Sequence, residues 1–236
     1  MTERLNKSKE NVSSMFDSIA PKYDFLNHFL SMGIDKRWRK KVRKLLAYKK
    51  DAVILDVATG TGDLAIELHK NKPLRVVGID ISEKMVEVGK AKVIAKKLDN
   101  VIDLQTGDSL DIKFDANTFD AVTCAFGVRN FENLEKGLSE IFRVLKTNSK
   151  IVVLEFSKPN NKVFGGIYKF YFTKILPFVG RMISKNDFAY KYLPMSVDKF
   201  PYGKEFLDIL QKVGFCETKT KKLAAGIASI YCGVKK

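Results

Sequence analysis

The chain has 236 residues, of which 45% are hydrophobic, and this content suffices for a full core and excludes an intrinsically disordered chain. No apolar run approaches the roughly 18 residues of a membrane-spanning helix. The opening residues MTERLNKSKENVSS lack the apolar core of a secretory signal, so we expect a cytoplasmic protein.

The charge balance is strongly positive, with 42 Lys and Arg residues against 27 Asp and Glu residues and a formal net charge of +15. Such an excess favours an anionic partner, for which nucleic acid and anionic lipid both qualify. Lysines that only keep the surface soluble explain it equally well. The net charge alone therefore does not distinguish between these classes of function.

The N-terminal part, residues 7–48, shows helical spacing of its apolar residues. Pro21 predicts a break inside this stretch, because proline lacks the N–H group that an interior helical residue donates. Residues 35–44 are strongly basic. We expect residues 1–48 to form a helical lid on the part of the chain that follows.

From residue 52 the pattern changes to short apolar runs that alternate with helical stretches. The predicted strands are 52–57, 74–80, 101–108, 119–126 and 150–156. Predicted helices span 64–70, follow a cap at Ser82, and span 134–146. The alternation predicts an α/β fold with a mostly parallel sheet and right-handed crossovers. The strands are apolar throughout, as expected when helices cover both faces.

The alternation ends after residue 157. Residues 162–184 are rich in aromatic and basic side chains, and a helical pattern resumes over residues 203–213. Residues 216–223 and 227–234 are predicted to be closing strands in an antiparallel hairpin, which brings the sheet to seven strands. We treat residues 158–200 as a helical insertion that faces the substrate or a membrane, and the whole chain, 1–236, as one domain.

Polar residues follow the predicted strands at their carboxyl ends, where ligands of open α/β sheets bind. The first three strands are followed by the candidate cofactor-binding residues Asp56, Gly60, Thr61, Gly62, Asp63, Asp80, Asp108 and Ser109. Arg129 and Asn130 come after the fourth strand.

The residue types favour one cofactor over another. Gly60 and Gly62 let the backbone turn tightly beside a ligand, a weak signal that also fits a dinucleotide fingerprint. Asp63 would lie where a pyrophosphate binds and would repel it. S-adenosylmethionine carries a positive ammonium and a positive sulfonium group instead, so we expect this cofactor.

Two further acids would contact the same cofactor. Asp80 would accept hydrogen bonds from both ribose hydroxyls, and Asp108 would accept one from the adenine amino group. In the alternative interpretation, Asp63 only caps the following helix and Asp108 only ends a strand. Because the acids follow successive strands in order, we favour the ligand-binding interpretation.

The series 55–63, 76–80 and 107–108 resembles the class I methyltransferase pattern of a Rossmann-like sheet. Two longer stretches, 23–38 (YDFLNHFLSMGIDKRW) and 143–157 (RVLKTNSKIVVLEFS), further resemble the signatures of the family that C-methylates ubiquinone and menaquinone precursors. The likeness covers nearly the whole chain.

This sequence departs from the family pattern at a few positions. Leu26 and Asp35 replace the usual Met and His of the first signature, and residues 147–149 replace the usual Pro-Gly-Gly turn of the second. Asp35 argues against a catalytic role for its position. Thr-Asn-Ser still predicts a turn, so the strand after it should survive.

The resemblance implies that a ring carbon of a reduced polyprenyl quinone receives a methyl group from S-adenosylmethionine. Demethylmenaquinol is the substrate most closely indicated, and a ubiquinone precursor is the alternative. The ring carbon would attack the sulfonium methyl group in line, so the protein must align both partners and help to remove protons. We expect no metal. Glu155, at the end of the fifth strand, would orient the site from behind.

Four residues are catalytic candidates. Arg129 and Asn130 are assigned to the quinol oxygens, with Arg129 stabilising phenolate character. Tyr23 could relay a proton, and Asp24 could hold Arg129 or a water molecule. In the alternative, Arg129 is a surface residue of a turn, and Tyr23 and Asp24 only pack and pair. His28 could act as a base, because imidazole in general exchanges protons near neutral pH, yet a lone histidine among apolar residues is more often simply packed.

A polyprenyl tail partitions into membranes, so we expect the enzyme to contact an anionic membrane surface. The stretch 162–185 suits such contact, and a buried amphipathic helix is the alternative.

The positive net charge also makes a nucleic-acid methyltransferase an alternative interpretation. Because FGVRN (126–130) stands where base-methylating enzymes typically carry an Asx-Pro-Pro-aromatic motif, we expect no nucleic-acid partner. A non-catalytic module that binds S-adenosylmethionine or NAD is a further alternative.

Overall fold

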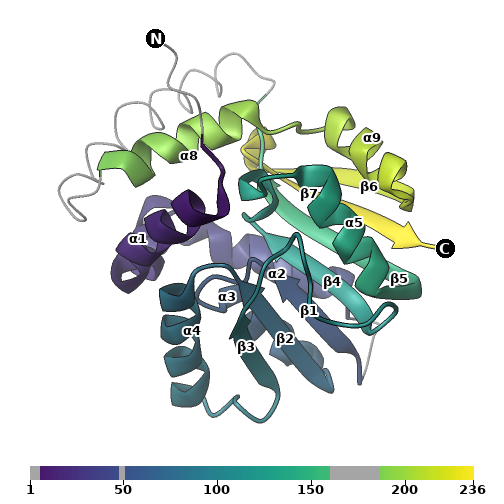
Figure 1. The fold of residues 1–236 in the computed structure, drawn as a ribbon, viewed down its shortest axis with the longest axis horizontal. Coiled ribbons are helices and arrows are strands. Elements are labelled where there is room, and N and C mark those ends of the chain that lie inside the picture. Colours follow the sequence, from purple (N-terminus) through teal and green to yellow (C-terminus); the bar gives the residue numbers. More distant parts are fainter. Residues whose placement is uncertain (1–5, 48–50, 160–186) are drawn as a thin grey trace.

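The computed structural model describes residues 6–47, 51–159 and 187–236, and Figure 1 shows the ribbon. Within these ranges seven strands form one sheet in the order β3-β2-β1-β4-β5-β7-β6. Their bounds are β1 Val53–Val57, β2 Arg75–Asp80, β3 Ile102–Thr106, β4 Phe119–Ala125, β5 Leu145–Phe156, β6 Cys216–Leu223 and β7 Ala228–Lys235.

Helices surround this sheet. The α-helices in the described ranges are α1 Lys9–Leu30, α2 Ile34–Leu45, α3 Asp63–Leu68, α4 Glu83–Ala95, α5 Leu134–Val144, α8 Asp187–Lys199 and α9 Lys204–Val213. Short 3-10 turns are η1 His69–Asn71, η2 Val128–Asn130 and η4 Ala224–Gly226.

The strand order reverses at β1. This strand pairs in parallel with β2 on one side and with β4 on the other, and parallel pairing continues to β3 and to β5. The chain therefore builds one half of the sheet outward from β1, returns, and builds the other half in the opposite direction. Such a reversal leaves a crevice at the carboxyl ends of the two central strands.

The far half of the sheet closes with antiparallel strands. β7 pairs antiparallel with β5 from Ser149–Lys235 to Phe156–Ala228, and β6 pairs antiparallel with the other edge of β7. The predicted closing hairpin and the mostly parallel seven-stranded sheet are therefore confirmed.

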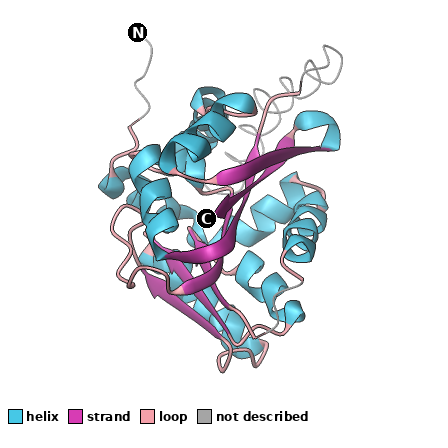
Figure 2. Ribbon diagram, turned by 90° about the vertical axis from the view of Figure 1, so that its right-hand side faces the viewer, coloured by secondary structure: helices cyan, strands magenta, loops and turns pink. Residues whose placement is uncertain are grey.

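Alternate side chains of each strand pack into separate cores. Leu55 and Val57 of β1 pack with α5 and α9, whereas Ile54, directly before Leu55, packs with α2, α3 and α4. Figure 2 shows the helices on both sides of the sheet. Because side chains alternate across a strand, burial of both faces requires the uninterrupted apolar runs seen in the sequence.

The predicted helix break at Pro21 is wrong, because α1 continues through this residue. Pro21 is exposed, so the missing N–H group lies on the solvent side of the helix, while Val12, Met15 and Ala20 are buried and hold it. The chain turns instead just before α2, where Gly33 adopts the left-handed backbone conformation at φ 71°.

The second correction concerns the start of β5. The sequence predicts a helix to residue 146 and a strand from residue 150, but the helix ends at Val144 and β5 begins at Leu145. The register of β4 with β5 shifts between Phe119 and Ala121, and Asn148 has φ 59°. The predicted turn is therefore a bulge inside a longer strand. The other bounds from residue 52 onward agree within two residues.

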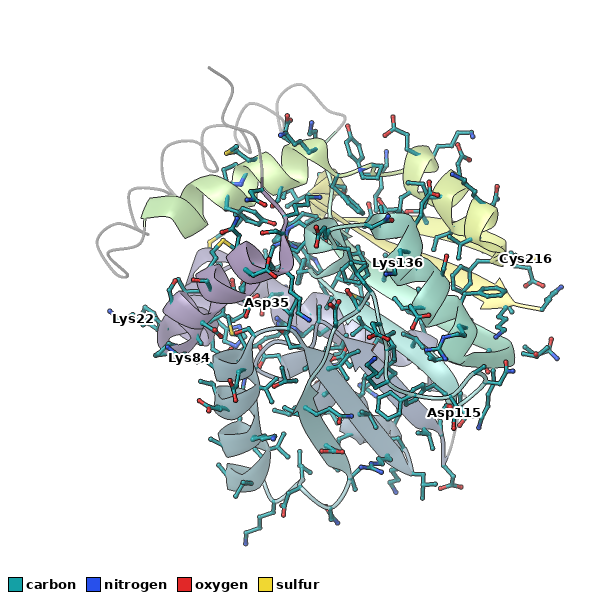
Figure 3. All side chains as sticks on the ribbon, in the orientation of Figure 1. Lys22, Asp35, Lys84, Asp115, Lys136 and Cys216 are labelled. Atoms are coloured by element: carbon teal, nitrogen blue, oxygen red, sulfur yellow. The ribbon has the colours of Figure 1, made fainter. Side chains whose placement is uncertain are left out.

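Exposed lysines lie on separate parts of the surface. Lys22 and Lys84 lie at the outer edge of the molecule beside α1 and α4, whereas Asp35 lies within it (Figure 3). Among the described residues, none of the helices combines the length and apolar character needed to cross a bilayer. The stretch 162–185, expected above to contact a membrane, lies outside the described residues.

Candidate active site

A cleft, partly open to solvent, lies at the carboxyl ends of β1, β2 and β4, with α1 as one wall. Half of the sequence-predicted site residues line it, namely Tyr23, Gly60, Asp80, Asp108, Ser109 and Asn130. The other half surround it without forming its lining, namely Asp24, Asp56, Thr61, Gly62, Asp63 and Arg129.

Two strand ends beside the cleft have an unusual backbone. Ala58, directly after β1, has φ 53°, and Phe126, directly after β4, has φ 59°. A Cβ atom on Gly127 would overlap the Cβ of Ala58 and lie 2.8 Å from the Sγ of Cys124. The ends of β1 and β4 thus come so close that only glycine fits between them. Such strain commonly marks a functional site.

Asp80 ends β2 and places a buried carboxylate in the cleft. It accepts hydrogen bonds from the backbone N–H of Gly60 at 2.7 Å and of Ser82 at 2.9 Å. Burial raises the pKa of Asp80, and these two N–H groups oppose the rise. The hydroxyl of Ser82 accepts a hydrogen bond from the N–H of Met85, so the predicted cap of α4 is confirmed. A carboxylate can accept further hydrogen bonds, so Asp80 retains capacity for a ligand.

Asp56 lies behind the cleft and fixes its floor. Its carboxylate accepts hydrogen bonds of 2.7 Å from the hydroxyls of both Thr59 and Thr123. Burial raises the pKa of Asp56 to about 6, and these hydroxyls oppose the rise. Asp56 therefore joins the loop after β1 to the neighbouring strand β4.

Lys92 of α4 joins three parts of the site. Its Nζ lies 2.6 Å from a carboxylate oxygen of Asp24 on α1 and 2.6 Å from one of Asp63 on α3. The hydroxyl of Thr61 donates to Asp24 and lies 3.2 Å from the same Nζ. The hypothesis that Asp24 holds Arg129 therefore finds no support in this geometry. Lys92 instead ties the lid helix to the cofactor loop.

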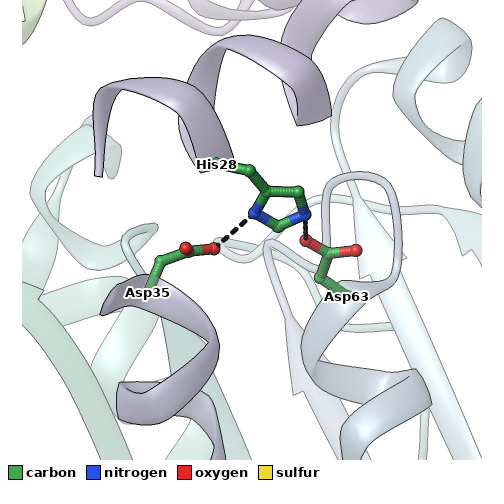
Figure 4. Close-up of side chains that lie close together, drawn as sticks. All are labelled: His28, Asp35 and Asp63. Carbon is green, nitrogen blue, oxygen red and sulfur yellow. Dashed lines mark hydrogen bonds and ion pairs between the residues drawn. The ribbon is translucent and has the colours of Figure 1, made fainter. Parts of the chain in front are cut away.

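His28 is held between two carboxylates, as Figure 4 shows. Its Nδ1 lies 2.8 Å from Asp35 and its Nε2 lies 3.5 Å from Asp63. Arg39 forms ion pairs with the same two acids. Burial would raise the pKa of Asp63, but Arg39 and Lys92 outweigh it and lower that pKa. Arg39 thus supplies the cation that balances this His–Asp cluster.

Arg129 is buried, which contradicts the alternative of a surface residue in a turn. Its guanidinium donates to Glu155 at 2.8 Å, to the hydroxyl of Ser196 at 3.3 Å and to the carbonyl of Phe126. Its side chain is 6% exposed and that of Glu155 is 0% exposed. Burial raises the pKa of Glu155, and the charge of Arg129 opposes the rise. Arg129 therefore fixes the turn that carries Asn130.

Asn130 and Tyr23 present polar groups to the cleft. The Oδ1 atom of Asn130 is buried and has no hydrogen-bond partner among the described residues. Since a buried carbonyl oxygen without a partner is costly, this atom suits a donor on a bound ligand. Tyr23 packs edge-on against Phe16 at 6.1 Å, and burial raises the pKa of its hydroxyl.

Sequence reasoning missed several lining residues. Lys7 and Lys9 precede and begin α1, and Lys9 forms a 3.1 Å ion pair with Asp108. In a lysine-rich N-terminal stretch, no sequence signal distinguishes these two from solubilising lysines. The apolar lining includes Val12, Phe16, Ile79, Met85, Leu110, Phe126 and Phe131. Helical spacing predicts that Phe16 is packed, but not that it faces a ligand.

Comparisons with known proteins agree with this geometry. The sequence profile of the ubiE/COQ5 methyltransferase family matches residues 3–235. The chain is 45% identical to the ubiquinone/menaquinone biosynthesis C-methyltransferase UbiE of Geotalea daltonii over 98% of this chain and 99% of that one. It is 43% identical to the demethylmenaquinone methyltransferase of Bacteroides fragilis over 97% of this chain and 94% of that one.

Solved structures share the fold. The [4+2]-cyclase SpnF superposes with a TM-score of 0.71 at 15% identity, covering 97% of this chain and 96% of that one. A SAM-dependent methyltransferase from Aquifex aeolicus superposes with a TM-score of 0.62 at 22% identity, covering 84% and 89%. These similarities confirm the predicted class I methyltransferase fold.

The raised pKa of Asp56 predicts a pH-dependent stability difference. Its folded-state pKa of about 6 exceeds the ordinary 3.8, so the folded state binds this proton more tightly than the unfolded state. The proton on Asp56 therefore stabilises the folded state fully below about pH 4, and this stabilisation is lost as the pH rises through about 6. Relative to wild type, Asp56→Asn should gain about 3 kcal/mol of unfolding free energy between about pH 4 and 7.5.

Urea unfolding of both proteins across this pH range measures the difference, and titrating groups that do not interact with Asp56 cancel in the comparison. A difference that is independent of pH would contradict the raised pKa.

The buried Arg129–Glu155 pair predicts a second stability effect. Arg129→Met leaves the carboxylate of Glu155 buried without its cation, so unfolding free energy should fall by roughly 3–5 kcal/mol. Adding Glu155→Gln to the same chain removes that charge and should recover a large part of the loss. Urea unfolding of the single and double variants measures both effects. If the double variant is no more stable than Arg129→Met, the pair does not compensate as described.

Proposed function

Since the chain belongs to the ubiE/COQ5 methyltransferase family, we propose that it transfers a methyl group from S-adenosylmethionine to a ring carbon of a reduced polyprenyl quinone. Demethylmenaquinol is the proposed substrate, and a ubiquinone precursor is the alternative. The demethylmenaquinone methyltransferase relative in Bacteroides fragilis supports the first, and the double name of the UbiE relative leaves room for the second.

The observation that carries the cofactor assignment is the acid at the tip of β2. Asp80 lies beside the point of strand reversal, buried and open to the cleft, and its carboxylate suits the two ribose hydroxyls. Asp108 and Ser109 line the same cleft after β3, where the adenine would lie. S-adenosylmethionine supplies an electrophilic methyl group on a positive sulfonium, and the acids of this cleft favour a cationic ligand.

The loop after β1 completes the proposed cofactor site. Gly60 lines the cleft, and Asp56 holds the loop from behind through Thr59. Thr61, Gly62 and Asp63 belong to the same loop and to the start of α3. Because Asp63 is engaged by Lys92 and two other basic side chains, we assign it to fixing the loop.

The substrate side of the cleft combines apolar walls with few polar groups, as an aromatic ring with hydroxyls requires. The unpartnered Oδ1 of Asn130 can accept a hydrogen bond from a quinol hydroxyl, and Tyr23 lies on the α1 wall of the same cleft. Arg129 stands behind Asn130, and its positive charge opposes the rise that burial causes in the pKa of Tyr23. The same charge would favour phenolate character on the substrate. Asp24 positions α1 through Lys92.

We also propose peripheral contact with an anionic membrane, and the described residues offer a surface for it. α2 exposes the basic side chains of Lys36, Arg37, Lys40, Lys41 and Lys44. Next to its start, Met32 is 82% exposed, and Phe25 on α1 is 60% exposed. Basic residues beside exposed apolar ones suit a lipid interface.

Methyl transfer itself tests the proposed function. The purified protein, S-adenosylmethionine with a labelled methyl group and a short-tailed prenyl naphthoquinol kept reduced should give one labelled methyl per quinol ring, detected by mass spectrometry. A prenylated benzoquinol run in parallel decides between the two substrates.

The variant Asp80→Ala should weaken cofactor binding first, measured by calorimetry, because it lacks the carboxylate that accepts hydrogen bonds from the ribose. Unaltered cofactor affinity would refute the role of Asp80, and absence of transfer to both quinols would refute the function.

Vesicle binding tests the membrane contact. Wild-type protein should co-sediment with vesicles containing phosphatidylglycerol and not with neutral phosphatidylcholine vesicles, and added salt should weaken binding. Lys40→Glu with Lys44→Glu should lower the affinity about tenfold or more, since each basic residue near the surface contributes about 1 kcal/mol. The matched control, Lys219→Glu with Lys221→Glu, makes the same charge change on exposed β6 and should bind nearly as wild type. Equal losses in both pairs would show that only net charge matters.

A further inference from the structure

Lys7 occupies an unusual position for a lysine. It lies in the segment that leads into α1, and its half-buried side chain lines the cleft together with Tyr23 and Asn130. In Figure 1 this segment passes beneath α8 before the first helix begins. Its neighbour Lys9 is paired with Asp108, whereas Lys7 has no hydrogen bond or ion pair with any residue of the described ranges.

Charges from three elements act on the ammonium of Lys7. Burial lowers the pKa of Lys7 most, and Arg129 of η2 and Lys199 of α8 lower it further, while Glu155 of β5 acts in the opposite direction. The cleft holds further titratable groups that face the same space, namely Lys9, Tyr23, Asp80, Asp108 and Glu132. Lys7 therefore gives up its proton more readily than an ordinary exposed lysine, and the neutral amine is the form that accepts a proton.

Four other candidates for a base are engaged by partners, keep their proton or lie outside the lining of the cleft. Burial raises the pKa of Tyr23, which keeps its hydroxyl protonated at neutral pH. Asp80 accepts two backbone hydrogen bonds, and Glu155 is paired with Arg129. His28 lies between two carboxylates and outside the lining of the cleft.

Resting on the quinol methylation proposed above, we propose that the ε-amino group of Lys7 is the catalytic base that takes the proton from the substrate's ring hydroxyl. The unpartnered Oδ1 of Asn130 accepts a hydrogen bond from the quinol and so orients its ring. Lys7 reaches the hydroxyl from the α1 side of the cleft. The assignment gives a function to a residue that neither sequence motif contains.

Proton removal from the quinol precedes methyl transfer. The hydroxyl O–H bond breaks, its proton moves to the Nζ of Lys7, and the oxygen keeps the electron pair. The ring carbon then forms a bond to the methyl carbon while the methyl–sulfur bond breaks and its electron pair stays on sulfur. Loss of the ring proton to water restores the aromatic ring, and the Lys7 ammonium returns its proton to the oxygen. One proton is released per methyl group transferred.

Three variants separate a base from a mere positive charge. Lys7→Met removes the amine and keeps the length of the side chain, Lys7→Arg keeps a charge that does not deprotonate, and Lys7→Ala leaves room for an added amine. Exposed Lys221→Met on β6 is the matched control and should behave as wild type. The assay uses the short-tailed naphthoquinol in detergent, and calorimetry follows S-adenosylmethionine binding in every variant.

The expected result is a loss of about 100-fold or more in kcat for both Lys7→Met and Lys7→Arg, with cofactor affinity unchanged. In wild type, kcat/KM should rise with pH toward the pKa of Lys7, and this rise should be absent in both variants. Ethylamine should restore part of the activity of Lys7→Ala and should not affect Lys7→Met.

Two outcomes would overturn the assignment. If Lys7→Arg is as active as wild type, the residue supplies charge alone, and if Lys7→Met keeps both kcat and the pH profile, it is no base. Both outcomes require that wild-type protein methylates the quinol. A wild type that binds S-adenosylmethionine and methylates neither quinol would instead refute the proposed function, so the two failures remain distinct.

Discussion

Buried carboxylates at the carboxyl ends of three parallel strands are the constraint on which this site depends. Asp56 ends up beneath the loop after β1, Asp80 at the tip of β2 and Glu155 at the tip of β5, and all three are buried. Each is compensated differently, by two hydroxyls, by two backbone N–H groups and by Arg129 respectively. Because a buried charge without a partner is strongly unfavourable, these partners fix the loops around the cleft as firmly as the core fixes the strands.

The fold could be predicted closely from the sequence, because its signals are local. Uninterrupted apolar runs mark β1 to β5, and the cap at Ser82 marks the start of α4. The two errors also have local causes. Pro21 lies on the exposed side of a helix held by packing, so its lost hydrogen bond does not end α1. A bulge at Asn148 extends β5 backward, and such a bulge depends on the neighbouring strand, which a single-strand pattern does not reveal.

The site could be predicted only where residues stand next to strand ends. Asp80, Asp108 and Asn130 line the cleft as expected, since strand direction alone brings them together. Asp24, Asp63 and Arg129 have partners set by tertiary packing, and Lys92, which joins the first two, lies in the last turn of α4 and belongs to no motif. Lys7 could not be found at all, because its place in the cleft depends on how the tertiary fold positions the segment before α1.

The direction of the last strand separates the two ends of the described chain. The central strands point toward the cleft, whereas β7 runs antiparallel to β5 and ends at Lys235, at the opposite edge of the sheet. The segment before α1, in contrast, forms part of the cleft wall. A purification tag or reporter attached after Lys236 therefore lies away from the cleft. One attached at the N-terminus would instead be joined to the segment that forms part of the cleft wall.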